Sequence, residues 1–194
     1  MLAKSKLIPF LVEEDFNKMN TNVKKITLSG VFLALCMVLP FITGGIPKIG
    51  NVLSPMHIPV LLCGFVCGGP YGLLVGFIAP ILRFALFGMP PLFPIGLSMA
   101  FELASYGLIS GILYKKLPKK LPYIYVTLIT AMIVGRFVWG FVRFIFARLL
   151  SIDFSMNMFV NAAFITAIPG IVCHIIIVPI VVVALNKARL LLNE

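Results

Sequence analysis

The sequence KKLPKK at residues 115–120 separates two long, apolar parts of this 194-residue chain. It is one of three basic clusters that together hold most of the chain's 16 lysines and arginines. The other two precede the first apolar stretch and close the chain: Lys4, Lys6, Lys18, Lys24 and Lys25, and then Lys187 and Arg189. By the positive-inside rule, all three clusters belong on the cytoplasmic side of a membrane. We therefore expect an even number of spans on each side of residues 115–120 and both termini in the cytoplasm.

The composition indicates a single membrane domain at residues 23–194, after a cytoplasmic tail at 1–22. Hydrophobic residues make up 61% of the chain and charged residues only 11%, where soluble proteins have about 25% charged residues. The formal net charge of +10 does not indicate a nucleic-acid partner, because the basic residues flank apolar stretches. The lipid bilayer, with its anionic headgroups at the cytoplasmic face, is the expected partner for them.

The apolar stretches predict an all-α, polytopic protein with six transmembrane helices. A helix needs about 20 residues to cross the hydrocarbon core. The expected spans are residues 26–42, 58–67, 71–86, 95–114, 121–150 and 159–188, and residues 1–20 are expected to be a mobile tail or a surface helix. The turn Gly68-Gly69-Pro70 makes the second span unusually short. We expect its neighbours to bury it, since lipid cannot satisfy its free backbone ends.

Charged side chains inside the expected spans are the main candidates for function, because such residues are costly in a membrane. Arg83, Glu102, Arg136 and Arg143 lie within spans, while Arg148 and Asp153 lie nearer the outer end. Arginine does not escape burial by losing its proton, and four arginines face only two acids. A surplus of positive charge therefore favours an anionic partner in this part of the chain.

Arg136 and Arg143 are seven residues apart and so lie on one helix face, with Trp139 between them. This pattern suits a planar, partly anionic solute, because guanidinium binds a carboxylate or phosphate and indole stacks on a ring. We expect Arg136, with Arg83 close by in space, to bind the solute. Two roles stay open for Glu102: it could neutralise one arginine as a structural pair, or it could contact the solute. Arg148 could extend to the membrane interface instead of binding the solute.

Further polar residues are weaker candidates for solute contacts: His57, Asn51 and Asn157 near the outer loops, and His174 deep in the last span. The histidines could equally be packing residues, and the asparagines could cap helix ends. The apolar loop at 87–94, with Met89, Pro90, Pro91 and Phe93, is expected to close over the bound solute as a lid.

Other patterns limit the possible chemistry. The four cysteines lie inside apolar stretches, and Cys63-x-x-x-Cys67 is not a common metal-ligand spacing. The sequence contains neither a phosphate-binding Gly-x-x-x-x-Gly-Lys-[Ser/Thr] loop nor a His-Glu-x-x-His motif. We therefore expect no metal, no cofactor, no ATPase site and no enzymatic activity.

Four short runs, MHIPVLL at 56–62, GPYG at 69–72, GMPP at 88–91 and GRFVWG at 135–140, resemble the substrate-binding S components of energy-coupling factor (ECF) transporters. The resemblance covers residues 23–188 and implies a subunit of an ABC-type importer in a prokaryotic cell membrane. Members of this family capture a water-soluble vitamin or precursor at the outer face. They then associate with a transmembrane coupling subunit and two ATPase subunits, and topple to release the solute inside.

In that family a pair of small residues four apart on the first helix, typically two alanines, contacts the coupling subunit. The matching positions here are Gly30 and Ala34, where glycine replaces one alanine but preserves close approach.

Two other classes remain as alternatives. Ser98 and His174 could form the dyad of an intramembrane serine protease, although no glycine follows the serine to open an oxyanion pocket. A stand-alone channel or exporter would need a pore or cation-coupling acids, and Glu102 is the only deep carboxylate. The solute itself stays open among pantothenate, a pyridoxine-like ring and a pyrimidine precursor.

Overall fold

The structure is a computed structural model that describes residues 3–42, 54–188 and 190–193, and these residues form helices without any strand. The long elements are α1 (Ala3–Ile42), α3 (His57–Cys67), α4 (Gly69–Phe87), α5 (Leu97–Lys116), α6 (Leu121–Leu150) and α8 (Ile168–Lys187). Three short helical segments join them: η1 (Leu92–Gly96), α7 (Met156–Val160) and η2 (Asn161–Ile165).

The helices confirm an all-α, polytopic membrane protein. Within the described residues, five helical stretches are long and apolar enough to cross a membrane, and α3 is a shorter apolar helix of 11 residues. The bounds of α6 agree with the expected span at 121–150. The expected span at 159–188 is instead divided among α7, η2 and α8.

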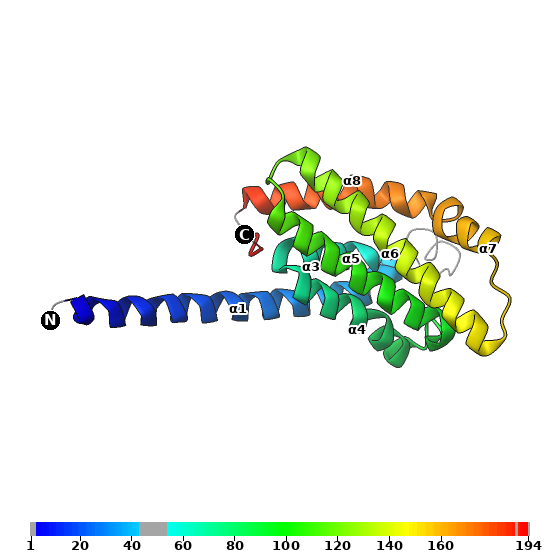
Figure 1. The fold of residues 1–194 in the computed structure, drawn as a ribbon, viewed down its shortest axis with the longest axis horizontal. Coiled ribbons are helices and arrows are strands. Elements are labelled where there is room, and N and C mark those ends of the chain that lie inside the picture. Colours follow the sequence, from blue (N-terminus) through cyan, green and yellow to red (C-terminus); the bar gives the residue numbers. More distant parts are fainter. Residues whose placement is uncertain (1–2, 43–53, 189, 194) are drawn as a thin grey trace.

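Helix α1 begins much earlier than the first expected span. It runs from Ala3 to Ile42, and the 20 residues at 10–29, between Pro9 and Gly30, contain neither glycine nor proline. No break marks the expected boundary between residues 22 and 23. Figure 1 shows the first part of α1 projecting well beyond the helix bundle.

Helix α3 lies in the centre of the bundle, packed against α1, α4, α5 and α8. All its residues except Ile58 are buried, as expected for a helix too short to cross lipid alone. Glycines let α4 and α5 approach α3 and one another: a Cβ on Gly107 would lie 2.2 Å from the backbone oxygen of Gly72. A Cβ on Gly64 would lie 2.1 Å from the hydroxyl oxygen of Ser110. These small residues therefore serve packing within the monomer.

The last turn of α3 is completed by residues from the other end of the chain. The backbone N–H of Leu192 donates to the carbonyl of Val66 at 2.9 Å. The side-chain amide of Asn193 donates to the carbonyl oxygens of Gly64 at 3.3 Å and of Gly111 at 2.9 Å. The final carbonyls of a helix have no partner within it, so the bond from Leu192 satisfies the acceptor of Val66. The carbonyl of Gly64 also accepts the backbone N–H of Gly68, and Asn193 adds a second donor there while it ties α3 to α5.

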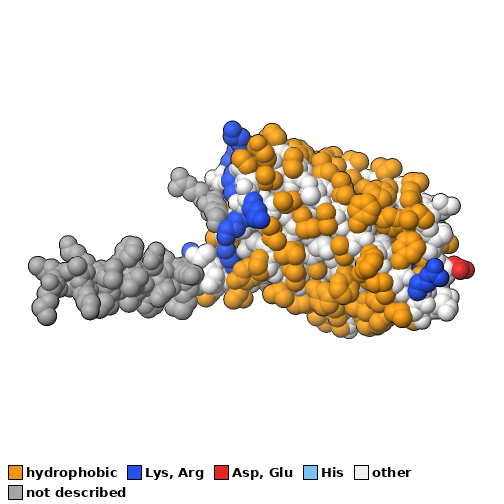
Figure 2. All heavy atoms as spheres, viewed as in Figure 1, with side chains coloured by type: hydrophobic (Ala, Val, Ile, Leu, Met, Phe, Trp, Pro, Cys, Tyr) orange, Lys and Arg blue, Asp and Glu red, His pale blue; other side chains and the backbone are white. Residues whose placement is uncertain are grey.

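The surface has the distribution expected of a membrane protein. Figure 2 shows apolar side chains covering the flank of the bundle, with lysine and arginine gathered at the end from which α1 projects. Figure 1 shows that residues 190–193 and the connection between α5 and α6 lie at this same end. The described lysines of the three basic clusters thus gather at one end of the bundle, and its orientation toward the cytoplasm stands as a prediction.

Candidate functional site

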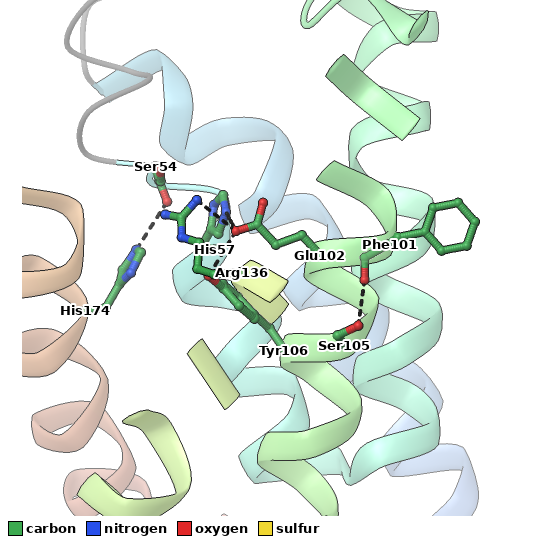
Figure 3. A network of polar contacts seen from close by, with 8 residues as sticks. All are labelled: Ser54, His57, Phe101, Glu102, Ser105, Tyr106, Arg136 and His174. Atoms are coloured by element: carbon green, nitrogen blue, oxygen red, sulfur yellow. Dashed lines mark hydrogen bonds and ion pairs between the residues drawn. The ribbon is translucent and has the colours of Figure 1, made fainter. Parts of the chain in front are cut away.

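A buried carboxylate, Glu102 on α5, is the centre of a polar cluster inside the bundle (Figure 3). Glu102 is only 2% exposed. The Nη1 atom of Arg136, on α6, lies 2.9 Å from its Oε1 atom, and the hydroxyl of Tyr106 donates to the same oxygen at 3.0 Å. The Nε2 atom of His57, at the start of α3, lies 3.8 Å from it. Three different helices therefore converge on one carboxylate.

The local sequence explains why these groups meet. Glu102 and Tyr106 are four residues apart, so both point from the same face of α5. Gly135 lets the tyrosine ring lie directly against α6, because a Cβ there would come within 2.1 Å of the ring atom Cε1. Arg136 follows Gly135 in the chain, so this close approach also brings its guanidinium to the carboxylate.

Two histidines extend the cluster toward α8. The rings of His57 and His174 are stacked, with centroids 5.8 Å apart and planes at 21°. The Nε2 atom of His174 lies 3.3 Å from the backbone oxygen of Ser54 (Figure 3). Both rings are buried, at 3% and 1% exposure.

Several polar atoms of this cluster have no hydrogen-bond partner among the described residues: Nε of Arg136 and the Nδ1 atoms of His57 and His174. Buried polar groups in folded proteins are nearly always bonded, and each exception needs an explanation. A polar ligand that approaches from within the bundle would satisfy such atoms.

Arg136 also lines a cavity of about 260 Å³ between α6, η2 and α8. The other lining side chains are all apolar: Ile129, Met132, Ile133, Phe164, Ile171 and Ile175. The guanidinium of Arg136 thus joins two environments, the charged cluster around Glu102 and an apolar cavity. Such a combination of apolar walls with few polar groups is typical of small-molecule sites.

Other residues expected at the site make their contacts elsewhere. Arg83 donates from Nη1 to the backbone oxygen of Met37 at 3.0 Å and lies over the rings of Phe41 and Phe87. No contact found in the described residues joins Arg83 to the Glu102 cluster, and its expected place beside Arg136 at a solute site stays a prediction.

Trp139 lies one turn beyond Arg136 on α6, among aromatic rings. Its ring stacks on Phe159, with centroids 6.2 Å apart, and meets Phe154 edge to face at 5.9 Å. The side chain of Asn157 is exposed, while Asn51 lies outside the described residues.

The expected lid is formed by an exposed loop between α4 and α5. The side chains of Met89 and Phe93 are 52% and 56% exposed, and the peptide bond before Pro90 is cis. The ring of Phe93 contacts that of Phe146 on α6, with centroids 5.3 Å apart. The loop that also contains Pro91 therefore reaches the C-terminal part of α6, and its closing over a solute stands as a prediction.

Ser98 and His174 have separate hydrogen bonds. The hydroxyl of Ser98 donates to the backbone oxygen of Pro94 at 2.6 Å, whereas His174 contacts Ser54. These contacts do not form the dyad of a serine protease. In the part of the chain that the structure describes, no cluster of histidine, cysteine and acidic side chains could hold a metal ion.

The sequence pointed to most of this cluster but missed Tyr106. The signal that could have identified it is its spacing of four residues from Glu102 on one helix. His174 lies directly against His57, so the two histidine candidates belong to one cluster.

Six apolar helices with an ion pair enclosed among them define an integral membrane protein with a polar site in its interior. The sequence model of the family described as "ECF transporter, substrate-specific component" matches residues 24–186, and the chain therefore belongs to this family. It is a substrate-binding transporter subunit rather than an enzyme. A comparison with curated proteins finds none that matches the chain.

Proposed function

We propose that this protein captures a small water-soluble solute, a vitamin or vitamin precursor, at the outer face of a prokaryotic cell membrane. It delivers the solute inward together with a coupling subunit and two ATPase subunits. The observation that carries this proposal is the guanidinium of Arg136, which pairs with Glu102 on one side and borders the 260 Å³ cavity on the other.

Arg136 has two separable roles in this proposal. Its Nη1 atom neutralises Glu102, while its buried Nε atom has no partner among the described residues and is available to an acceptor on the solute. Charged side chains inside a membrane are costly, pair with one another and mark solute pathways in many transporters. His57 and His174 offer further ring nitrogens on the neighbouring side of the same cluster.

The first helix offers a surface for the coupling subunit. Gly30 and Ala34 are both exposed on α1, and a Cβ on Gly30 would meet no atom within 4 Å. The glycines of α3, α4 and α5, in contrast, are enclosed by their neighbours. Gly30 and Ala34 are thus free for close approach by a helix of another subunit, and small residues favour such contacts in membranes.

The experiment that tests the solute site uses Arg136→Lys and Arg136→Ala. Purified parent and variants are incubated with a protein-free small-molecule extract, washed and denatured, and mass spectrometry identifies the released compound. Calorimetric titration with that compound then gives dissociation constants. Arg148→Ala is the matched control, since Arg148 lies on the same helix with an exposed side chain.

Lysine keeps a positive charge for Glu102 but lacks the planar fork and the Nε donor. Arg136→Lys should therefore fold normally and still bind more weakly than the parent. Loss of a hydrogen bond to a charged group costs about 1.5–3 kcal/mol, which is about a tenfold to hundredfold rise in the dissociation constant. If Arg136→Lys and Arg136→Ala both fold and bind as tightly as the parent, Arg136 is structural and the site assignment fails.

A further inference from the structure

The arginines in and near the membrane differ in what compensates their charge. Arg136 pairs with Glu102 at 2.9 Å, and Arg83 donates to a backbone oxygen. Arg148 is exposed. Arg143 stands apart, because its Nε and Nη1 atoms are buried and have no hydrogen-bond partner among the described residues.

The surroundings of Arg143 supply no negative side chain. Its guanidinium lies 5.3 Å from the ring centre of Phe154, and it borders a shallow hollow with Pro94, Ala147, Ile152 and Phe154 that has no room for a water molecule. The nearest acid in the sequence, Asp153, has an exposed side chain. The ion pairs in the described part of the chain all involve Glu102. A cation–π contact offsets only part of the loss of water around a guanidinium.

Arg143 lies on the same face of α6 as Arg136, seven residues further along, which corresponds to about 10 Å along the helix axis. Trp139 lies between them and contacts Phe154, the ring that covers Arg143. The two arginines and the indole therefore form one line that runs from the Glu102 cluster toward the segment 151–155.

We propose that Arg143 is the anion-binding group of the solute site and that the solute is a small organic acid. Its carboxylate or phosphate pairs with Arg143, its planar or apolar part lies along Trp139, and its other end reaches the cluster at Arg136, about 10 Å away. This inference rests on the proposed function and adds the chemical class of the solute. The ring of Phe154 occupies the position over Arg143 and moves aside when the anion binds.

Charge balance favours Arg143 over Arg136 as the partner of an anion. Arg136 already has a carboxylate partner, so a second anion there would place two negative groups beside one guanidinium. Arg143 has neither a negative partner nor an acceptor for its buried Nε and Nη1 atoms among the described residues, and a guanidinium pairs best with a carboxylate or phosphate in the fork geometry. The phosphate of a lipid headgroup has the same chemistry, and the experiment separates the two sources.

The experiment compares purified parent, Arg143→Gln and Arg148→Gln in a phosphate-free detergent. Each protein is incubated with a protein-free small-molecule extract, washed and denatured, and the released compounds are divided into an aqueous and an organic phase for mass spectrometry. Trp139 is the only tryptophan of the chain, so its fluorescence reports binding of the identified compound directly. Removing an unpaired buried charge should leave the stability of Arg143→Gln equal to or above that of the parent.

The expected result is a water-soluble acid released from the parent and from Arg148→Gln, and at least tenfold less of it from Arg143→Gln. If the compound is neutral or cationic, or if Arg143→Gln retains the acid fully, the inference fails while the proposed function stands. If Arg143→Gln loses only a phospholipid from the organic phase, Arg143 is a lipid contact and the inference also fails. If the parent captures no water-soluble compound, the proposed function fails and this inference with it.

Discussion

The ion pair between Arg136 and Glu102 allows a quantitative prediction about the stability of the bundle. Glu102→Gln keeps the shape of the side chain and an oxygen that can still accept the hydrogen bond from Tyr106. What it removes is the negative charge 2.9 Å from the guanidinium of Arg136. The loss of stability should therefore come almost entirely from leaving that guanidinium unpaired.

Breaking a buried ion pair by removing one partner costs about 3–5 kcal/mol. The side chain of Glu102 is 3% exposed and that of Arg136 is 12% exposed, so water at the cavity relieves part of the cost. We expect about 3 kcal/mol for Glu102→Gln and a similar loss for Arg136→Met. The double variant leaves no unpaired charge and should lose no more than either single variant. The coupling energy of the double-mutant cycle is then about 3 kcal/mol.

The measurement is the free energy of unfolding in mixed micelles, with denaturing detergent as the titrant and the fluorescence of Trp139 as one probe. Helical circular dichroism serves as the second probe, and coincident transitions support a two-state analysis. Arg148→Met is the control and should change the free energy of unfolding by less than about 0.5 kcal/mol. A loss below about 1 kcal/mol for Glu102→Gln, with additive single effects, would show that the pair is well hydrated and would refute the reasoning.

Three further predictions concern topology and helix contacts. A cysteine introduced at Asp153 should react with a membrane-impermeant reagent added outside intact cells, whereas a cysteine at the exposed Lys116 should not. Labelling at position 116 from outside would contradict the expected orientation. Replacing both Gly30 and Ala34 with leucine should weaken solute uptake and assembly with the coupling subunit, and should leave the solute affinity in titrations unchanged. An equal loss of assembly and solute affinity would place the two residues in packing within the monomer. Gly107→Ala should lower the free energy of unfolding by about 1–3 kcal/mol through overpacking, because its Cβ would lie 2.2 Å from a backbone oxygen of α4. Gly30→Ala, which meets nothing within 4 Å, is the matched control, and equal effects of the two alanines would contradict the packing argument.

The sequence predicted the elements that depend on local signals. Helix α6 begins at Leu121, directly after a lysine-rich turn that contains a proline, and the turn at Gly68 separates α3 from α4. A helix at residues 1–20 was one of the two expectations, but its continuity with the first span was missed, because the lysines and acids between residues 13 and 25 interrupt the apolar pattern. Helix propensity alone is a weak signal.

At the candidate site, too, the sequence predicted relations within one helix but not the contacts between helices. Spacing along α6 correctly placed Arg136 and Arg143 on one face, since that relation is internal to a helix. Which helix lies opposite depends on packing, and here Gly135 admits Tyr106 and so brings α5 beside α6. For this reason the partner of Arg136 is Glu102, as the structural-pair alternative allowed, while Arg83 turns to a backbone oxygen of α1.

The bonds between the end of α3 and residues 192–193 tie the centre of the bundle to the order in which the chain is made. Chains emerge from the ribosome beginning at the N-terminus, so α3 enters the membrane long before Leu192 and Asn193 exist. Until then, the carbonyl of Val66 lacks the donor that it has in the finished fold, and that of Gly64 has the backbone N–H of Gly68 without the second bond from Asn193. The most deeply buried helix is thus among the last to be completed, and truncation before residue 192 should harm maturation of the protein more than its small size would suggest.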